Sequence, residues 1–135
     1  MGSQEKFRLA QQFLETLRSG AAPDEVASLC TPNLDWNVPG DPGALPWIGR
    51  MTGREAVSHF VRDARMMVEG IGFDITEVLA SNDRTVILGR VQSRIKATGK
   101  LIDSELAVVL TFADAKIVSF LLLEDSFAVS LVARH

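Results

Sequence analysis

Residues 85–124 read TVILGRVQSRIKATGKLIDSELAVVLTFADAKIVSFLLLE, and their alternation decides the fold. A pattern with a period of two runs through 85–97, 101–112 and 116–124, with continuous apolar stretches at 106–110 and 120–123, and residues 72–80 just before them show it too. A period of two is typical of a half-buried strand. The links between these runs have the length of hairpin turns, so the runs predict four strands of an antiparallel sheet.

Before residue 70 three stretches have the period of a helix. Apolar residues recur every three or four positions along 4–19, after Pro23 and along 56–67. The third stretch follows residues 52–55, Thr-Gly-Arg-Glu, which have the form of a capping box, with hydroxyl and carboxylate binding free backbone amides. Helices followed by a meander predict an α+β fold with the helices on one face of the sheet.

The composition fits one domain that spans residues 1–135. With 135 residues, 47% of them hydrophobic, the core needs neither a disulfide nor a metal, and Cys30 is the only cysteine. The net charge of −3 and the dispersed basic residues argue against a nucleic-acid partner. The chain has no apolar run that would span a bilayer and no signal-peptide stretch, so we expect a cytoplasmic protein without a membrane partner.

The turn between the second and third strands decides which side chains face the helices. A two-residue turn at 98–99 pairs Val91 with Leu106 and Ser93 with Ser104 on that inner face. The opposite charges of Arg94 and Asp103 would then meet on the outer face. Five polar residues share this outer face: Arg90, Gln92, Arg94, Asp103 and Glu105. The apolar residues among them, Leu88, Leu101, Ala107 and Val109, favour a homodimer through the outer face.

A three-residue turn at 113–115 carries the inner face onto the last strand. It places Phe120 opposite Val108 and Leu122 opposite Leu106, so the inner face is apolar up to its last rung. On that rung Glu124 meets Ser104 and Ser93. If Glu124 is buried there, its pKa is raised. The alternative is that Glu124 lies in water at a frayed strand end.

The segment 34–38 alternates as a further short strand, and it leaves two readings open. Either Leu34, Trp36 and Val38 face the core, or Asp35 and Asn37 do. A proline-rich loop follows and carries Trp47, whose ring either stacks on a ligand at a pocket mouth or anchors the loop.

Taken in order, five segments of the chain resemble the SnoaL-like branch of the nuclear transport factor 2-like superfamily. They are Asp-Trp-Asn-Val-Pro-Gly-Asp-Pro at 35–42, Pro-Trp-Ile-Gly at 46–49, Gly-Arg-Glu-Ala-Val at 53–57, Ala-Thr-Gly-Lys at 97–100 and Lys-Ile-Val at 116–118. This resemblance implies a cone-shaped α+β barrel of the cystatin-like kind, with N-terminal helices packed on a curved antiparallel sheet around a conical pocket, commonly in a dimer.

The superfamily includes ketosteroid isomerases, limonene epoxide hydrolases and polyketide cyclases, but their catalytic positions are not kept here. The isomerase base falls near Asn37, and the oxyanion donors fall near Phe13 and Val108. The acid on the last strand falls on Leu122, and the epoxide hydrolase arginine, at Arg90, would have Gln92 in place of its partner carboxylate. The resemblance does imply that the Asn37 face points into the cone, which would bring Asp35 there as well.

Two functions follow from these residues. The first is an enzyme that moves a proton on a small apolar, cyclic or polyketide-like molecule, as an isomerase, cyclase or hydrolase, with Asp35 or Glu124 as acid or base and Asn37 as hydrogen-bond donor. The second is a non-catalytic protein that binds such a molecule. No cofactor and no metal site is expected, because no ligand spacing occurs. The expected binding residues are Phe13, Trp47, Phe60, Val91, Ser93, Ser104, Leu106, Val108, Phe120 and Leu122.

Overall fold

A computed structural model describes residues 2–134 of the chain. Four helices and six strands occur within this range. In chain order they are α1 (Ser3–Arg18), α2 (Pro23–Ala27), β1 (Cys30–Val38), β2 (Gly49–Thr52), α3 (Glu55–Met67), β3 (Val68–Ala80), β4 (Arg84–Ile95), β5 (Leu101–Ala113), β6 (Lys116–Glu124) and α4 (Ser126–Arg134).

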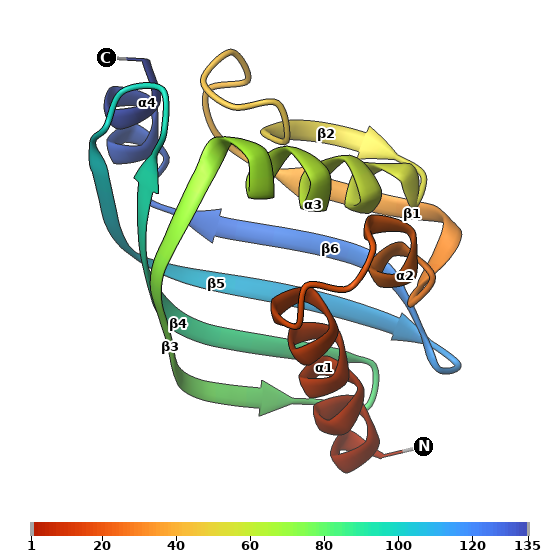
Figure 1. Cartoon of the computed structure of the whole chain (residues 1–135). Helices are drawn as coiled ribbons and strands as arrows, with labels where there is room; N and C mark the ends of the chain where they lie inside the picture. Colours follow the sequence, from red (N-terminus) through yellow and green to blue (C-terminus); the bar gives the residue numbers. More distant parts are fainter. Residues whose placement is uncertain (1, 135) are drawn as a thin grey trace.

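The strands form one curved sheet that wraps around α1 and α3, with the short helix α2 beside them (Figure 1). The strand order is β2-β1-β6-β5-β4-β3. This confirms the predicted α+β cone and the meander of β3 to β6. The sheet is mixed rather than purely antiparallel, because β1 runs parallel to its neighbour β6. None of the described helices is long and apolar enough to cross a membrane.

The predicted register between β4 and β5 is wrong by two residues. Val91 lies opposite Ser104, and Ser93 lies opposite Ile102. The chain turns over residues 96–100 instead of 98–99, and the Gly99 amide donates to the Ile95 carbonyl oxygen at 2.8 Å. A slip of two residues keeps every side chain on its predicted face, because the side chains of a strand alternate with a period of two.

The turn between β5 and β6 differs in the same way. It has two residues instead of three, and Asp114 adopts a positive φ of 55° there. A bulge between Thr111 and Phe112 then restores the inner face, so that Glu124 lies opposite Leu106 and not opposite Ser104.

The polar side chains of the outer face are exposed or half-exposed as predicted, but their ion pairs differ. Arg90, not Arg94, contacts Asp103, at 2.7 Å, and Arg94 contacts Glu69 of the neighbouring strand at 3.4 Å. The slip of the register causes the change of partners, because Arg94 now lies opposite Leu101.

Two local predictions at the start of α3 and in the first strand also need correction. No side chain caps α3, whose N-cap residue is Arg54, because Thr52 belongs to β2. In β1 the buried side is the apolar one: Leu34, Trp36 and Val38 are at most 1% exposed. The strand β2 and the helix α4 were not predicted.

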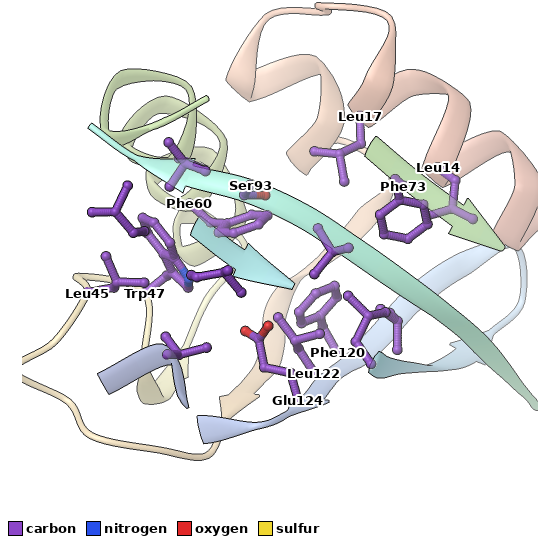
Figure 2. Close-up of a pocket in the computed structure, with 18 of the residues that line it drawn as sticks. Leu14, Leu17, Leu45, Trp47, Phe60, Phe73, Ser93, Phe120, Leu122 and Glu124 are labelled. Carbon is purple, nitrogen blue, oxygen red and sulfur yellow. The ribbon is translucent and has the colours of Figure 1, made fainter. Parts of the chain in front are cut away.

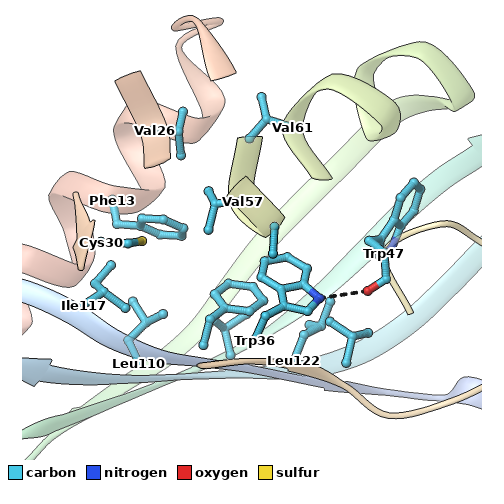
Figure 3. Close-up of a cluster of buried hydrophobic side chains, with 14 of the residues drawn as sticks. Phe13, Val26, Cys30, Trp36, Trp47, Val57, Val61, Leu110, Ile117 and Leu122 are labelled. Carbon is cyan, nitrogen blue, oxygen red and sulfur yellow. Dashed lines mark hydrogen bonds between the residues drawn. The ribbon is translucent and has the colours of Figure 1, made fainter. Parts of the chain in front are cut away.

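An aromatic stack joins β1 to the rest of the core (Figure 3). The ring of Trp36 stacks on Phe120 of β6, with 4.4 Å between centroids and 6° between planes. Its Nε1 donates to the carbonyl oxygen of Trp47 at 2.9 Å. The ring of Phe60 packs edge-on against Trp47, with 5.5 Å between centroids. These contacts hold the loop before β2 against the core, and they fix the position of the Trp47 side chain.

Candidate functional site

A cavity of about 240 Å³ lies between the helices and the inner face of the sheet. Nine of the ten predicted binding residues line it: Phe13, Trp47, Phe60, Val91, Ser93, Leu106, Val108, Phe120 and Leu122. An apolar cavity of about 150 Å³ can hold benzene. The volume here is therefore enough for a molecule of about two small fused rings.

Different elements form the two ends of the cavity (Figure 2). Leu14 and Leu17 of α1 lie with Phe73 of β3 at one end. Leu45 and Trp47, from the loop before β2, lie at the other end. The chain folds this way because each of these segments turns an apolar side toward the concave face of the sheet.

A clamp on α4 holds the end formed by the loop. The carboxylate of Asp41 accepts hydrogen bonds from Ser130 Oγ at 2.7 Å and from Arg134 Nη2 at 2.8 Å. The bonds from Arg134 and Ser130 hold the pKa of Asp41 well below its usual range. They tie α4, which contributes Val129 to the cavity wall, to the loop that contributes Leu45.

Glu124 is the acidic residue of the lining, and it sits at the end of β6. In Figure 2 its carboxylate points toward the apolar side chains of the cavity. Burial raises the pKa of Glu124, and the neighbouring charge of Asp125 raises it further. A carboxyl group of this kind holds its proton closer to neutral pH than an exposed one, as acid and base catalysts do.

The hydroxyls of the two serines differ in availability. Ser93 lines the cavity, and its Oγ makes no hydrogen bond within residues 2–134, so it is free for a ligand. Ser104 does not line the cavity, contrary to the prediction. Its Oγ donates to the Glu105 carbonyl oxygen at 2.9 Å and accepts from the Asp125 amide at 3.3 Å. Ser104 therefore holds the chain after Glu124, and its hydroxyl is not free to donate to a ligand.

The expectation that Asp35 and Asn37 face the cone is wrong. They occupy the side of β1 opposite to Trp36, and neither lines the cavity. The carboxylate of Asp35 is half-exposed and binds Arg50 of β2, with 3.2 Å between Nη2 and Oδ2. Burying Trp36 determines the orientation of the strand, because its large apolar ring gains more from burial than two polar groups.

Several lining residues were missed. Leu17 belongs to the helical stripe, and Phe73 is paired with Val91 in β3 and β4, so the sequence pattern contained a signal for both. Leu45 lies in a loop and Val129 in the unpredicted helix α4, and periodicity gives no signal for either.

The lining limits the chemistry of the site. Within residues 2–134 the lining includes no His, Lys, Arg or Cys, and no group of three potential ligands is placed to hold a metal ion. Burial raises the pKa of the Cys30 thiol to about 12, so this group is not a nucleophile near neutral pH. The groups left for chemistry are one carboxyl, Glu124, one hydroxyl, Ser93, and the indole N–H of Trp47.

Solved structures with this fold are numerous. An NTF2-like protein from Burkholderia xenovorans LB400 is 20% identical, covers 99% of both chains and superposes with a TM-score of 0.86. A candidate isomerase from Rhodopseudomonas palustris is 19% identical, with 96% of this chain and 97% of that chain covered and a TM-score of 0.77. A protein of ketosteroid isomerase-like fold from Catenulispora acidiphila DSM 44928, in complex with trimethylamine, is 19% identical over 93% and 91%, with a TM-score of 0.73.

These likenesses establish the fold alone. Identities near 20% say nothing about a shared activity. No curated protein matches the chain in sequence. The family model of the SnoaL-like domain matches residues 10–120, which is most of the chain. The chain therefore belongs to the SnoaL-like domain family, and its fold is that of the NTF2-like proteins.

Proposed function

We propose that this protein binds a small, largely apolar molecule in the cavity and that Glu124 exchanges a proton with it. The observation that carries the proposal is a cavity of about 240 Å³ with apolar walls and a single acidic group. Ligand sites are usually apolar pockets with a few polar groups that fix orientation. A molecule of one or two rings with one carbonyl group suits this site.

The chemistry available is proton transfer of the isomerase kind. The ionised carboxylate of Glu124 removes a proton from the carbon beside the carbonyl group. The electron pair of that C–H bond moves toward the carbonyl oxygen, where Ser93 Oγ or Trp47 Nε1 donates a hydrogen bond. The protonated Glu124 then returns the proton to the same carbon or to another carbon of the conjugated system. A raised pKa favours both steps near neutral pH, because the carboxyl both accepts and releases its proton there.

Non-catalytic binding is the second candidate function. The lining offers no second carboxylate, histidine or tyrosine within residues 2–134, so no partner group of the kind that related enzymes use assists Glu124. In this case the protonated Glu124 donates a hydrogen bond to the ligand and keeps its proton.

One experiment separates the two candidates. Calorimetry with 1-indanone and indane measures binding, and proton NMR in heavy water measures exchange of the protons beside the carbonyl of 2-indanone. The enzyme proposal predicts that 1-indanone binds more tightly than indane and that the protein accelerates the exchange. Glu124→Gln should abolish the acceleration, and Glu105→Gln on the exposed outer face should leave it unchanged. Binding without acceleration would favour the non-catalytic candidate, and no binding of any probe would refute both.

We also propose that two copies associate through the outer face of the sheet. Leu123 is 44% exposed there, and the half-buried Ala107, Val109 and Leu121 lie around it on β5 and β6. Contiguous apolar surface of this kind marks protein interfaces. Light scattering after size exclusion should give twice the monomer mass for the parent and the monomer mass for Ala107→Arg. The matched control is Phe127→Arg on α4, which should remain dimeric; a monomeric parent would contradict the proposal.

A further inference from the structure

The end of the cavity under α1 differs from the other end in its surroundings. Leu17 and Phe73 at this end are partly exposed, whereas Leu45 and Trp47 at the opposite end are buried. Figure 2 places Phe73 next to Leu14 and Leu17 of α1. This end, which we call the α1 mouth, is therefore more exposed to solvent than the end formed by Leu45 and Trp47.

Three basic side chains surround the α1 mouth. The guanidinium carbon of Arg18 lies 5.6 Å from the ring centroid of Phe73. Arg65, on α3, donates to the carbonyl oxygens of Ala21 at 2.6 Å and Leu17 at 3.3 Å. Lys96 Nζ donates to the carbonyl oxygen of Arg65 at 3.4 Å. Each of these bonds goes to an uncharged group or a ring, so no carboxylate within residues 2–134 forms an ion pair with these cations.

Two of the nearby acidic side chains are paired with other bases, whereas Glu15, three residues before Arg18 on α1, forms no ion pair within residues 2–134. Glu69 is 3.4 Å from Arg94, and Asp63 is 3.0 Å from Arg62. The α1 mouth therefore has an excess of positive charge, although the net charge of the chain is −3. Such a local field at the entrance of a low-dielectric cavity attracts anions.

We propose that the ligand of this protein carries a carboxylate, which Arg18 binds at the α1 mouth while the apolar body of the ligand fills the cavity. This inference rests on the proposed function, because it assumes that the cavity is the binding site. Arg18 is the best placed of the three cations: it is exposed, it stacks on a residue of the lining, and its donors are not committed to backbone oxygens. A guanidinium binds a carboxylate through two parallel hydrogen bonds, which fixes the orientation of the ligand.

The position of Arg18 in α1 has another explanation, which the experiment must exclude. A base in the last turn of a helix interacts favourably with the negative end of the helix dipole. That role stabilises the helix but makes no difference between a charged and an uncharged ligand. The discriminating quantity is therefore the ratio of the affinities for a carboxylate and for its amide.

The test uses indane-2-carboxylate and indane-2-carboxamide, which share one ring body and differ in charge. Calorimetry on the parent should give about tenfold tighter binding of the carboxylate, and high salt should reduce this ratio. In Arg18→Gln the ratio should fall to about one, and Arg18→Lys should retain part of it because the charge is kept. The control Arg8→Gln, also on an exposed turn of α1, should keep the parent ratio.

The outcomes separate this inference from the proposed function. Equal binding of carboxylate and amide by the parent, or a ratio that Arg18→Gln leaves unchanged, would overturn the carboxylate proposal and leave the cavity as the binding site. If neither indane derivative nor 1-indanone binds, the proposed function fails, and the carboxylate proposal fails with it.

Discussion

The environment of Glu124 predicts how the stability of the protein changes with pH. Burial and Asp125 raise the pKa of Glu124 in the folded state, whereas in the unfolded chain its pKa is near the ordinary value of about 4.3. Below that pH the Glu124 carboxyl is neutral in both states, so its ionisation does not change the free energy of unfolding. As the pH rises toward the folded-state pKa, the unfolded chain loses its proton first, so the free energy of unfolding falls.

The variant Glu124→Gln removes this loss, because glutamine does not ionise. Each pKa unit by which burial raises the group is worth about 1.4 kcal/mol. The difference in unfolding free energy between variant and parent should therefore grow between pH 4 and pH 8 in favour of the variant. It should level off above the folded-state pKa of Glu124, so the pH at which the rise ends reports where the carboxyl titrates in the folded protein.

Urea unfolding followed by circular dichroism at each pH measures this difference. The comparison variant is Glu105→Gln, whose parent side chain is 85% exposed and which should show no growing stabilisation. A difference curve for Glu124→Gln that stays flat from pH 4 to pH 8 would refute the reasoning, because it would mean that the carboxylate is solvated in the folded protein.

Three further changes have defined outcomes. Gly89→Ala puts a Cβ 2.7 Å from a backbone oxygen and should lower the free energy of unfolding in urea by about 1 to 3 kcal/mol. The Cβ of Gly70→Ala meets no atom within 4 Å, so this variant should lose less than about 1 kcal/mol. Equal losses in the two variants would contradict the packing around Gly89. Trp36→Phe loses the 2.9 Å bond to the Trp47 carbonyl and part of the stack, so we expect a loss of about 2 kcal/mol in the same assay. Asp41→Asn weakens the clamp on α4, so hydrogen exchange should accelerate in α4 and not in β5; unchanged exchange in α4 would show that the clamp is dispensable.

The faces of the meander strands were predictable from the sequence, and their partners were not. Alternation placed Val91, Leu106 and Phe120 on the inner face, and a slip of two residues did not change this. The slip itself depends on tertiary contacts: Thr98 Oγ1 donates to the carbonyl oxygen of Val132 at 2.9 Å, a contact with a helix that the sequence pattern did not reveal.

The sequence predicted the apolar walls of the candidate site but only some of its polar groups. Glu124 was found because the inner-face pattern continues to the end of β6. The alternation of β1 left both of its faces open, and the resemblance placed Asp35 and Asn37 in the cone; burial of Trp36 decides for the opposite face. The charge around the α1 mouth involves Arg18, Arg65 and Lys96, which are far apart in the sequence and meet only in the fold.

The central claim is that the cavity binds a small apolar molecule next to Glu124. Methyl NMR during a titration with 1-indanone tests it most directly. We predict saturable shifts for the methyl groups of Val91, Leu106 and Val108, which line the cavity, and none for those of Leu101 and Leu123 on the outer face. Shifts confined to the outer face, or no saturable shifts at all, would contradict the claim.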